Sequence, residues 1–171
     1  VLKAAKEVYE KTGKQQYYDY LYAYADTMIT DQGAIRTYKL SDQNLDMLNS
    51  GNVLLYLYPK TKEERFLEAL KTLRSQIDTQ PRTSDGGFWH KKRYTHQMWL
   101  DGLYMAEPFY AHYTQMFSDG ETAKKAYDDI VHQFDLIQEH SLDQETGLLY
   151  HGWDESREQK WANKETGTSP H

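Results

Sequence analysis

The feature that most constrains the fold of this chain is the spacing of its apolar and aromatic residues. They recur at helical intervals over most of the sequence. Such spacing places them along one face of an α-helix, where they can pack against a neighbouring helix. The sequence shows no convincing strand–helix–strand unit and no glycine-rich phosphate loop. It therefore predicts an all-α fold of about six helices, paired in about three hairpins.

Glycine, proline and capping residues set the expected limits of these helices. Gly13 is expected to end the first helix and Pro59 the third. Thr61 is expected to open the fourth in a capping box, and Pro108 to bend the fifth. A short strand is expected at residues 148–150. The expected helices span residues 2–12, 17–29, 42–58, 61–77, 98–116 and 119–140.

Composition and charge exclude several classes of partner. Acidic and basic residues are mixed along the chain, with a net charge of -6, which argues against nucleic-acid binding. No apolar run reaches the roughly 18 residues that a membrane span needs. The chain has no cysteine, and its His residues follow no metal-ligand spacing. We therefore expect no nucleic acid, membrane, metal or cofactor partner.

The aromatic content suits a sugar-binding cleft. The chain has 15 Tyr and 4 Trp, whose rings can stack on sugars while their polar tips form hydrogen bonds. The alternative is that these rings fill the space between helices.

Two aspartates and a histidine are candidates for catalysis or binding. Asp101 lies near the start of an expected helix, between Trp99 and Tyr104, in surroundings that suit a general acid. Asp46 lies among apolar positions and could supply the second carboxylate of a sugar hydrolase. His151 follows the expected strand and could contact a substrate. The alternatives are a carboxylate that complements the helix dipole, a surface aspartate and a structural histidine.

Four segments, taken in order, resemble one family of sugar hydrolases. They are Asn-Leu-Asp at residues 44–46 with Asn-Ser-Gly at 49–51, residues 85–91, residues 98–105 and residues 150–154. As a set they look like the unsaturated rhamnogalacturonyl hydrolases of glycoside hydrolase family 105. They resemble more distantly the unsaturated glucuronyl hydrolases of family 88. The similarity covers nearly the whole chain.

The resemblance implies an (α/α)6 barrel, of which this chain would supply about three helical hairpins. Residues 1–171 are then expected to form a partial catalytic domain, incomplete at both ends. The chain begins inside a helical pattern and stops after a turn-rich stretch, which fits that expectation. The remainder of the same domain would be one partner, and an oligosaccharide that carries an unsaturated uronate would be the other.

The resemblance also implies an unusual reaction. Pectin lyases leave a 4,5-unsaturated uronate at the non-reducing end of rhamnogalacturonan fragments, and these enzymes remove it by hydrating the C4=C5 double bond. Asp101 would act first as general acid and then as base, and Asp46 would assist. Substrate contacts would come from Trp99, His151, His90, Lys91 and Trp153.

Two other functions are compatible with the same residues. The chain could belong to another (α/α)6 sugar enzyme that acts on saturated glycosides. It could also be a helical-repeat module that binds a protein partner without catalysis, although no repeat consensus recurs.

Overall fold

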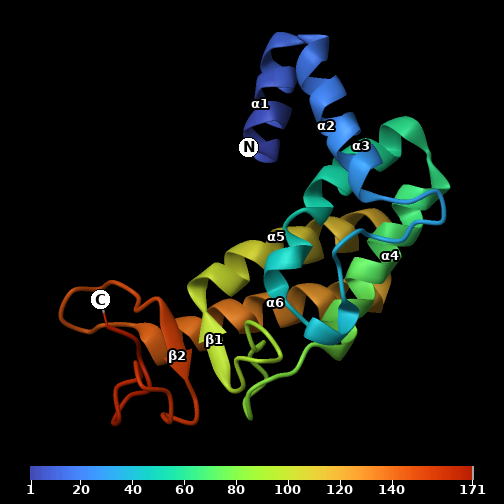
Figure 1. Ribbon diagram of the computed structural model, residues 1–171. Helices are drawn as coiled ribbons and strands as arrows, with labels where there is room; N and C mark the ends of the chain where they lie inside the picture. The colour runs from blue at the N-terminus through green and yellow to red at the C-terminus, as the bar shows by residue number, and fades with distance from the viewer. Residues whose placement is uncertain (171) are drawn as a thin grey trace.

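A computed structural model describes residues 1–170 and shows an all-α architecture of three helical hairpins (Figure 1). Consecutive helices pack against each other as α1 with α2, α3 with α4, and α5 with α6. The prediction of an all-α hairpin fold is therefore confirmed. The helices are α1 (Leu2–Thr12), α2 (Gln15–Met28), α3 (Gly51–Thr61), α4 (Glu64–Thr79), α5 (Leu100–Phe117) and α6 (Gly120–Ser141).

The observed helix ends agree with the predicted ones in the first hairpin and differ from them in the second. Gly13 ends α1 in the left-handed conformation, with φ of 65°, as its type suggests. Pro59, by contrast, lies inside α3, which continues until Lys62 takes up the left-handed conformation. Thr61 therefore belongs to α3 and cannot cap α4, which follows Glu63 and has no side-chain cap. The predicted end at Pro59 and the predicted capping box were both wrong.

The segment before α3 forms two short turns rather than the expected helix. They are η1 (Leu40–Asp42) and η2 (Leu45–Leu48), both 3-10 in geometry. Gln43 adopts a left-handed conformation between them, which interrupts the helix expected from residue 42. The Asn44 side chain then accepts a hydrogen bond from the Asp46 backbone N–H at 3.0 Å. This local bond fixes the turn that presents Asp46.

A two-stranded antiparallel ribbon precedes α5. Strand β1 (Gln97–Trp99) pairs with β2 (Gly152–Asp154), with Met98 opposite Trp153. The strand expected at residues 148–150 forms only an isolated bridge between Leu149 and Leu142. The ribbon runs directly into α5, so it fixes the direction in which the first turn of that helix leaves the sheet.

The hydrophobic core follows the hairpins. The larger cluster joins α2, α3, α4 and α5 around Phe66, Leu70 and Phe109. A smaller cluster lies under the ribbon and includes Met98 and Leu103. None of the described helices is long and apolar enough to cross a membrane.

Candidate active site

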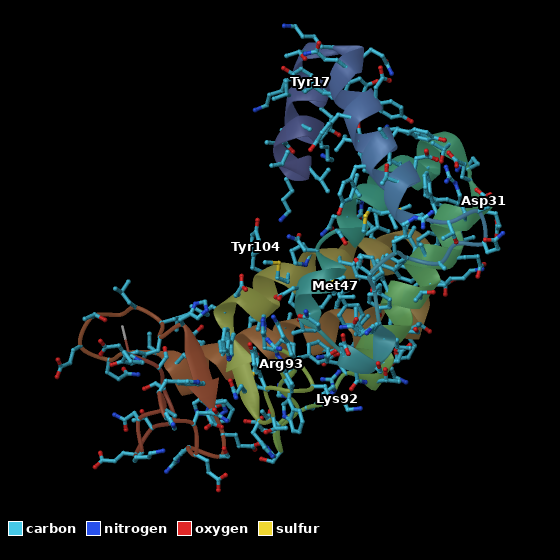
Figure 2. All side chains as sticks on the ribbon, in the orientation of Figure 1. Tyr17, Asp31, Met47, Lys92, Arg93 and Tyr104 are labelled. Atoms are coloured by element: carbon cyan, nitrogen blue, oxygen red, sulfur yellow. The ribbon has the colours of Figure 1, made fainter. Side chains whose placement is uncertain are left out.

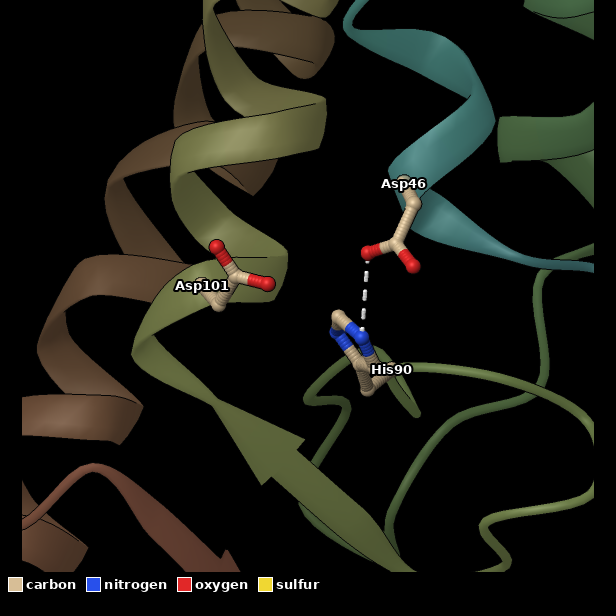
Figure 3. Close-up of side chains that lie close together, drawn as sticks. All are labelled: Asp46, His90 and Asp101. Carbon is tan, nitrogen blue, oxygen red and sulfur yellow. Dashed lines mark ion pairs between the residues drawn. The ribbon is translucent and has the colours of Figure 1, made fainter.

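The side chains of Asp46, His90 and Asp101 lie close together (Figure 3). Asp46 comes from η2, His90 from the loop before β1, and Asp101 from the first turn of α5. One ligand atom from each residue lies within 4.8 Å of those of the other two. The fold thus brings together the two aspartates and one of the histidines that the sequence suggested.

Backbone hydrogen bonds place His90 between the two aspartates. The Leu45 N–H donates to the His90 carbonyl at 3.1 Å, which ties the loop to η2. The His90 N–H donates to the Gln97 carbonyl at 2.8 Å, which ties it to β1. The buried Gln80 side chain also donates to the carbonyls of Gln43 and Trp89. His90 is therefore held from both sides.

Of the two basic side chains beside Asp46, Lys91 is charged and His90 is neutral. The Lys91 ammonium lies 2.5 Å from Asp46 Oδ2. His90 Nε2 lies 3.1 Å from Asp46 Oδ1, without the alignment of a hydrogen bond. Burial lowers the pKa of His90 and outweighs the opposing effect of the two aspartates, so the imidazole is neutral at pH 7. Lys91 is therefore the cation that balances Asp46.

Parallel aromatic rings form a platform beside the carboxylates. Trp99 is stacked on His90, with centroids 4.9 Å apart, and on Tyr94 at 5.3 Å. His151 and Trp161 meet the Trp99 ring edge-on at 5.6 and 6.5 Å. Trp99 and His151 were predicted from the sequence, whereas Tyr94 and Trp161 were not. Both lie outside any periodic pattern, so only the folded loops reveal them.

Trp153 does not belong to this platform. Its ring is buried and stacks on His140 at a centroid distance of 3.7 Å. Its indole N–H donates to the Thr166 carbonyl at 3.1 Å. The predicted contact between Trp153 and substrate is not supported by this placement, because β2 turns the ring under the ribbon. Trp153 instead anchors the C-terminal loop.

Two histidine–carboxylate pairs tie the surrounding loops together. His140 Nε2 lies 2.6 Å from Asp85 Oδ2, and His96 Nδ1 lies 3.0 Å from Glu155 Oε2. Burial alone would raise the pKa of Glu155, but hydrogen bonds from Ser84 and His96 outweigh it and lower that pKa. These pairs connect the loop that carries His90 to α6 and to the segment after β2. They therefore support the site without lining it.

The cluster is suited to proton transfer and less to holding a metal ion. Two carboxylates beside a neutral imidazole can exchange a proton with a substrate that rests on the platform. Their donor atoms are also close enough to be metal ligands. The Lys91 ammonium, however, already neutralises Asp46 and would repel a divalent cation there.

Paired carboxylates beside stacked aromatic rings suit a protein that binds and hydrolyses a carbohydrate. Residues 1–171 match the family model for glycosyl hydrolase family 88, and the chain belongs to that family. Its fold is the (α/α)6 toroid, of which it supplies three hairpins.

Several solved structures are similar to this chain. A family 105 glycoside hydrolase from C. acetobutylicum ATCC 824 is 46% identical, with a TM-score of 0.94 over 99% of this chain and 46% of its own. A possible family 105 member from Salmonella enterica serovar Paratyphi A is 25% identical, with a TM-score of 0.77 over 94% of this chain and 41% of its own. A possible member from Klebsiella pneumoniae gives the same identity and TM-score, over 94% and 40%. The chain thus spans less than half the length of each.

Proposed function

We propose that this chain carries the catalytic carboxylates of an unsaturated uronyl hydrolase. The enzyme would remove a 4,5-unsaturated uronate from the non-reducing end of rhamnogalacturonan fragments. The observation that carries this proposal is the meeting of Asp46 and Asp101 around a buried, neutral His90, in a chain of family 88. Residues 1–171 would form part of the catalytic domain, and the remaining length seen in the solved relatives would complete it.

The reaction would begin with proton transfer from Asp101 to C4 of the double bond. Water then adds its oxygen to C5 and returns a proton to the Asp101 carboxylate. The product is a hemiketal, which opens to a ketone at C5 and leaves a hemiacetal at C1. That hemiacetal expels the shortened saccharide as an alcohol and becomes an aldehyde. One water molecule is consumed, and no covalent bond to the enzyme forms.

Asp46 would assist by orienting the attacking water. Its charge is balanced by Lys91, so it can accept a hydrogen bond from water without competing for the proton on Asp101. Trp99 would stack on the sugar ring, with His151 at its edge. Lys91 would lie beside the sugar carboxylate, where its ammonium would offset part of the charge, and the buried His90 would support the Trp99 ring on which it stacks.

Replacement of Asp101 tests the assignment of the general acid. We expect Asp101→Asn to lower kcat on unsaturated rhamnogalacturonan disaccharide by about 100- to 10,000-fold, because amide nitrogen cannot deliver the proton. The rate is measured as loss of the absorbance of the double bond. Asp31→Asn serves as the matched control, because Asp31 is exposed on the loop after α2. Equal rates for Asp101→Asn and the unaltered enzyme would disprove the role of Asp101.

A further inference from the structure

A basic cavity adjoins the carboxylate cluster. Its volume is about 430 Å³, and its walls come from the turn before η2 and from the loop after His90. Lys91 lines this cavity and also pairs with Asp46, so the cavity and the catalytic cluster share a wall. The lining residues are Ser41, Asp42, Asn44, Lys91, Lys92 and Arg93.

The cavity carries positive charge that the protein itself does not neutralise. Lys91 is committed to Asp46, and Asp42 is the acidic residue in the lining. Within residues 1–170, neither Lys92 nor Arg93 has a carboxylate within ion-pair distance. Two cations therefore face one carboxylate, in a chain whose net charge is -6. A local surplus of this kind favours an anionic ligand.

Arg93 is held in place by the aromatic platform itself. Its Nη2 donates to the Tyr94 hydroxyl at 2.8 Å, and its guanidinium carbon lies 4.8 Å from the centroid of that ring. Tyr94 in turn stacks on Trp99. The side chains of Lys92 and Arg93 lie on the η2 and β1 side of the molecule (Figure 2). The aromatic platform therefore extends from the carboxylates to the Arg93 guanidinium, which Tyr94 holds in a fixed orientation.

We propose that Lys92 and Arg93 form a subsite for the carboxylate of a second uronate, on the reducing side of the sugar that rests over Asp101. This inference builds on the proposed function and adds a preference, among its substrates, for saccharides that carry a second acidic sugar. A guanidinium fits a carboxylate by paired hydrogen bonds, and a neighbouring ammonium adds charge. Saccharides with a single uronate would leave the cavity unoccupied.

The test compares two unsaturated substrates. One is a disaccharide whose second sugar is neutral, and the other is a tetrasaccharide with a second uronate on the reducing side. We expect the Lys92→Gln/Arg93→Gln double variant to lower the ratio of kcat/KM, tetrasaccharide over disaccharide, by about tenfold. The change should appear in KM for the tetrasaccharide. Methyl esterification of the second carboxylate should produce the same loss in the unaltered enzyme.

A matched control removes two charges elsewhere. Lys125 and Lys160 are exposed, and the Lys125→Gln/Lys160→Gln variant should leave the ratio unchanged. An unchanged ratio in the Lys92/Arg93 variant, or equal kcat/KM for the acid and its methyl ester, would overturn the subsite.

Calorimetric binding separates this proposal from the proposed function, because it needs no turnover. A saturated oligogalacturonide has no double bond, so its binding does not depend on the proposed reaction. It should bind the Lys92/Arg93 variant about tenfold more weakly than the unaltered protein. Equal affinity would refute the subsite, whereas weaker binding without hydration would refute only the proposed reaction.

Discussion

Glycine at residue 102 lets the buried imidazole of His90 pack against the first turn of α5. A β-carbon there would lie 2.8 Å from His90 Nδ1 and 3.2 Å from Leu45 Cδ1. Both neighbours are constrained, because His90 is bonded through its backbone to η2 and β1, and Leu45 is buried. The distance between Asp46 and Asp101 thus depends on the absence of a side chain between them.

We therefore expect Gly102→Ala to reduce both stability and kcat. Overpacking should cost about 1–3 kcal/mol of unfolding free energy, and displacement of His90 should disturb the carboxylates. Denaturant unfolding and kcat on an unsaturated disaccharide measure the two effects. Gly147→Ala is the control for kcat: its φ of 70° strains alanine and lowers stability, but no atom lies near its added β-carbon, so kcat should not change. A normal kcat for the Gly102→Ala enzyme would show that the position of His90 does not control the positions of the carboxylates.

At the scale of residues, the sequence predicted the proposed catalytic groups better than the aromatic rings that surround them. Asp101 and Asp46 belong to an ordered set of motifs that is recognisable as a set from the sequence. Tyr94 and Trp161 reach Trp99 only through the folding of loops, which no periodicity encodes. Trp153 lies two residues after His151 in the chain, yet its ring is buried and stacks on His140, a partner that no local pattern predicts.

Helix α5 carries a second, unexpected carboxyl group. Glu107 is only 3% exposed, and neither of its carboxylate oxygens has a hydrogen-bond partner among the described residues. Burial, with a smaller effect from Asp129, raises the pKa of Glu107 to about 8, and Arg82 opposes this only weakly. The group is therefore protonated in the folded protein at neutral pH, whereas it is ionised in the unfolded chain.

This difference makes stability depend on pH. Because folding must take up a proton, stability falls as pH rises from about 4.5 to about 8 and is level above that range. The slope from Glu107 is at most about 1.4 kcal/mol per pH unit.

Glu107→Gln is neutral in both states, so we expect it to be more stable than the unaltered protein at pH 8, with the advantage shrinking towards pH 5. Urea unfolding at both values measures it, with the exposed Glu139→Gln as control. Parallel curves for Glu107→Gln and the unaltered protein would show that Glu107 has a partner.

At the scale of elements, long amphipathic helices were predictable and their junctions were not. The periodic stripes of α2, α4 and α6 define those helices without tertiary information. The errors at Pro59, Thr61 and residues 148–150 all lie where a few residues choose between a turn, a cap and a strand. Pro59 lies in the last turn of α3, where its missing N–H leaves only the Leu55 carbonyl without its helical partner and the helix ends soon after.

At the scale of the molecule, three hairpins curve into an open array, with α1 and α2 at one end and the C-terminal loops at the other (Figure 1). The site lies where η2, the His90 loop and the start of α5 meet. The ordered set of motifs indicated this toroid through its resemblance to a known family, and the solved relatives confirm it. The aromatic platform and the basic cavity depend on loop geometry, and they became visible only in three dimensions.

The most direct test of the central claim counts double bonds and released sugars in the same reaction. Loss of the C4=C5 absorbance and release of the shortened saccharide are followed together on an unsaturated rhamnogalacturonan disaccharide. We predict that loss of the double bond keeps pace with or precedes release of the saccharide at every early time point, because hydration at C5 precedes cleavage. Release of saccharide that runs ahead of the loss of the double bond would show ordinary glycosidic hydrolysis, in which the freed unsaturated uronate opens and tautomerises only afterwards, and would contradict the proposed reaction.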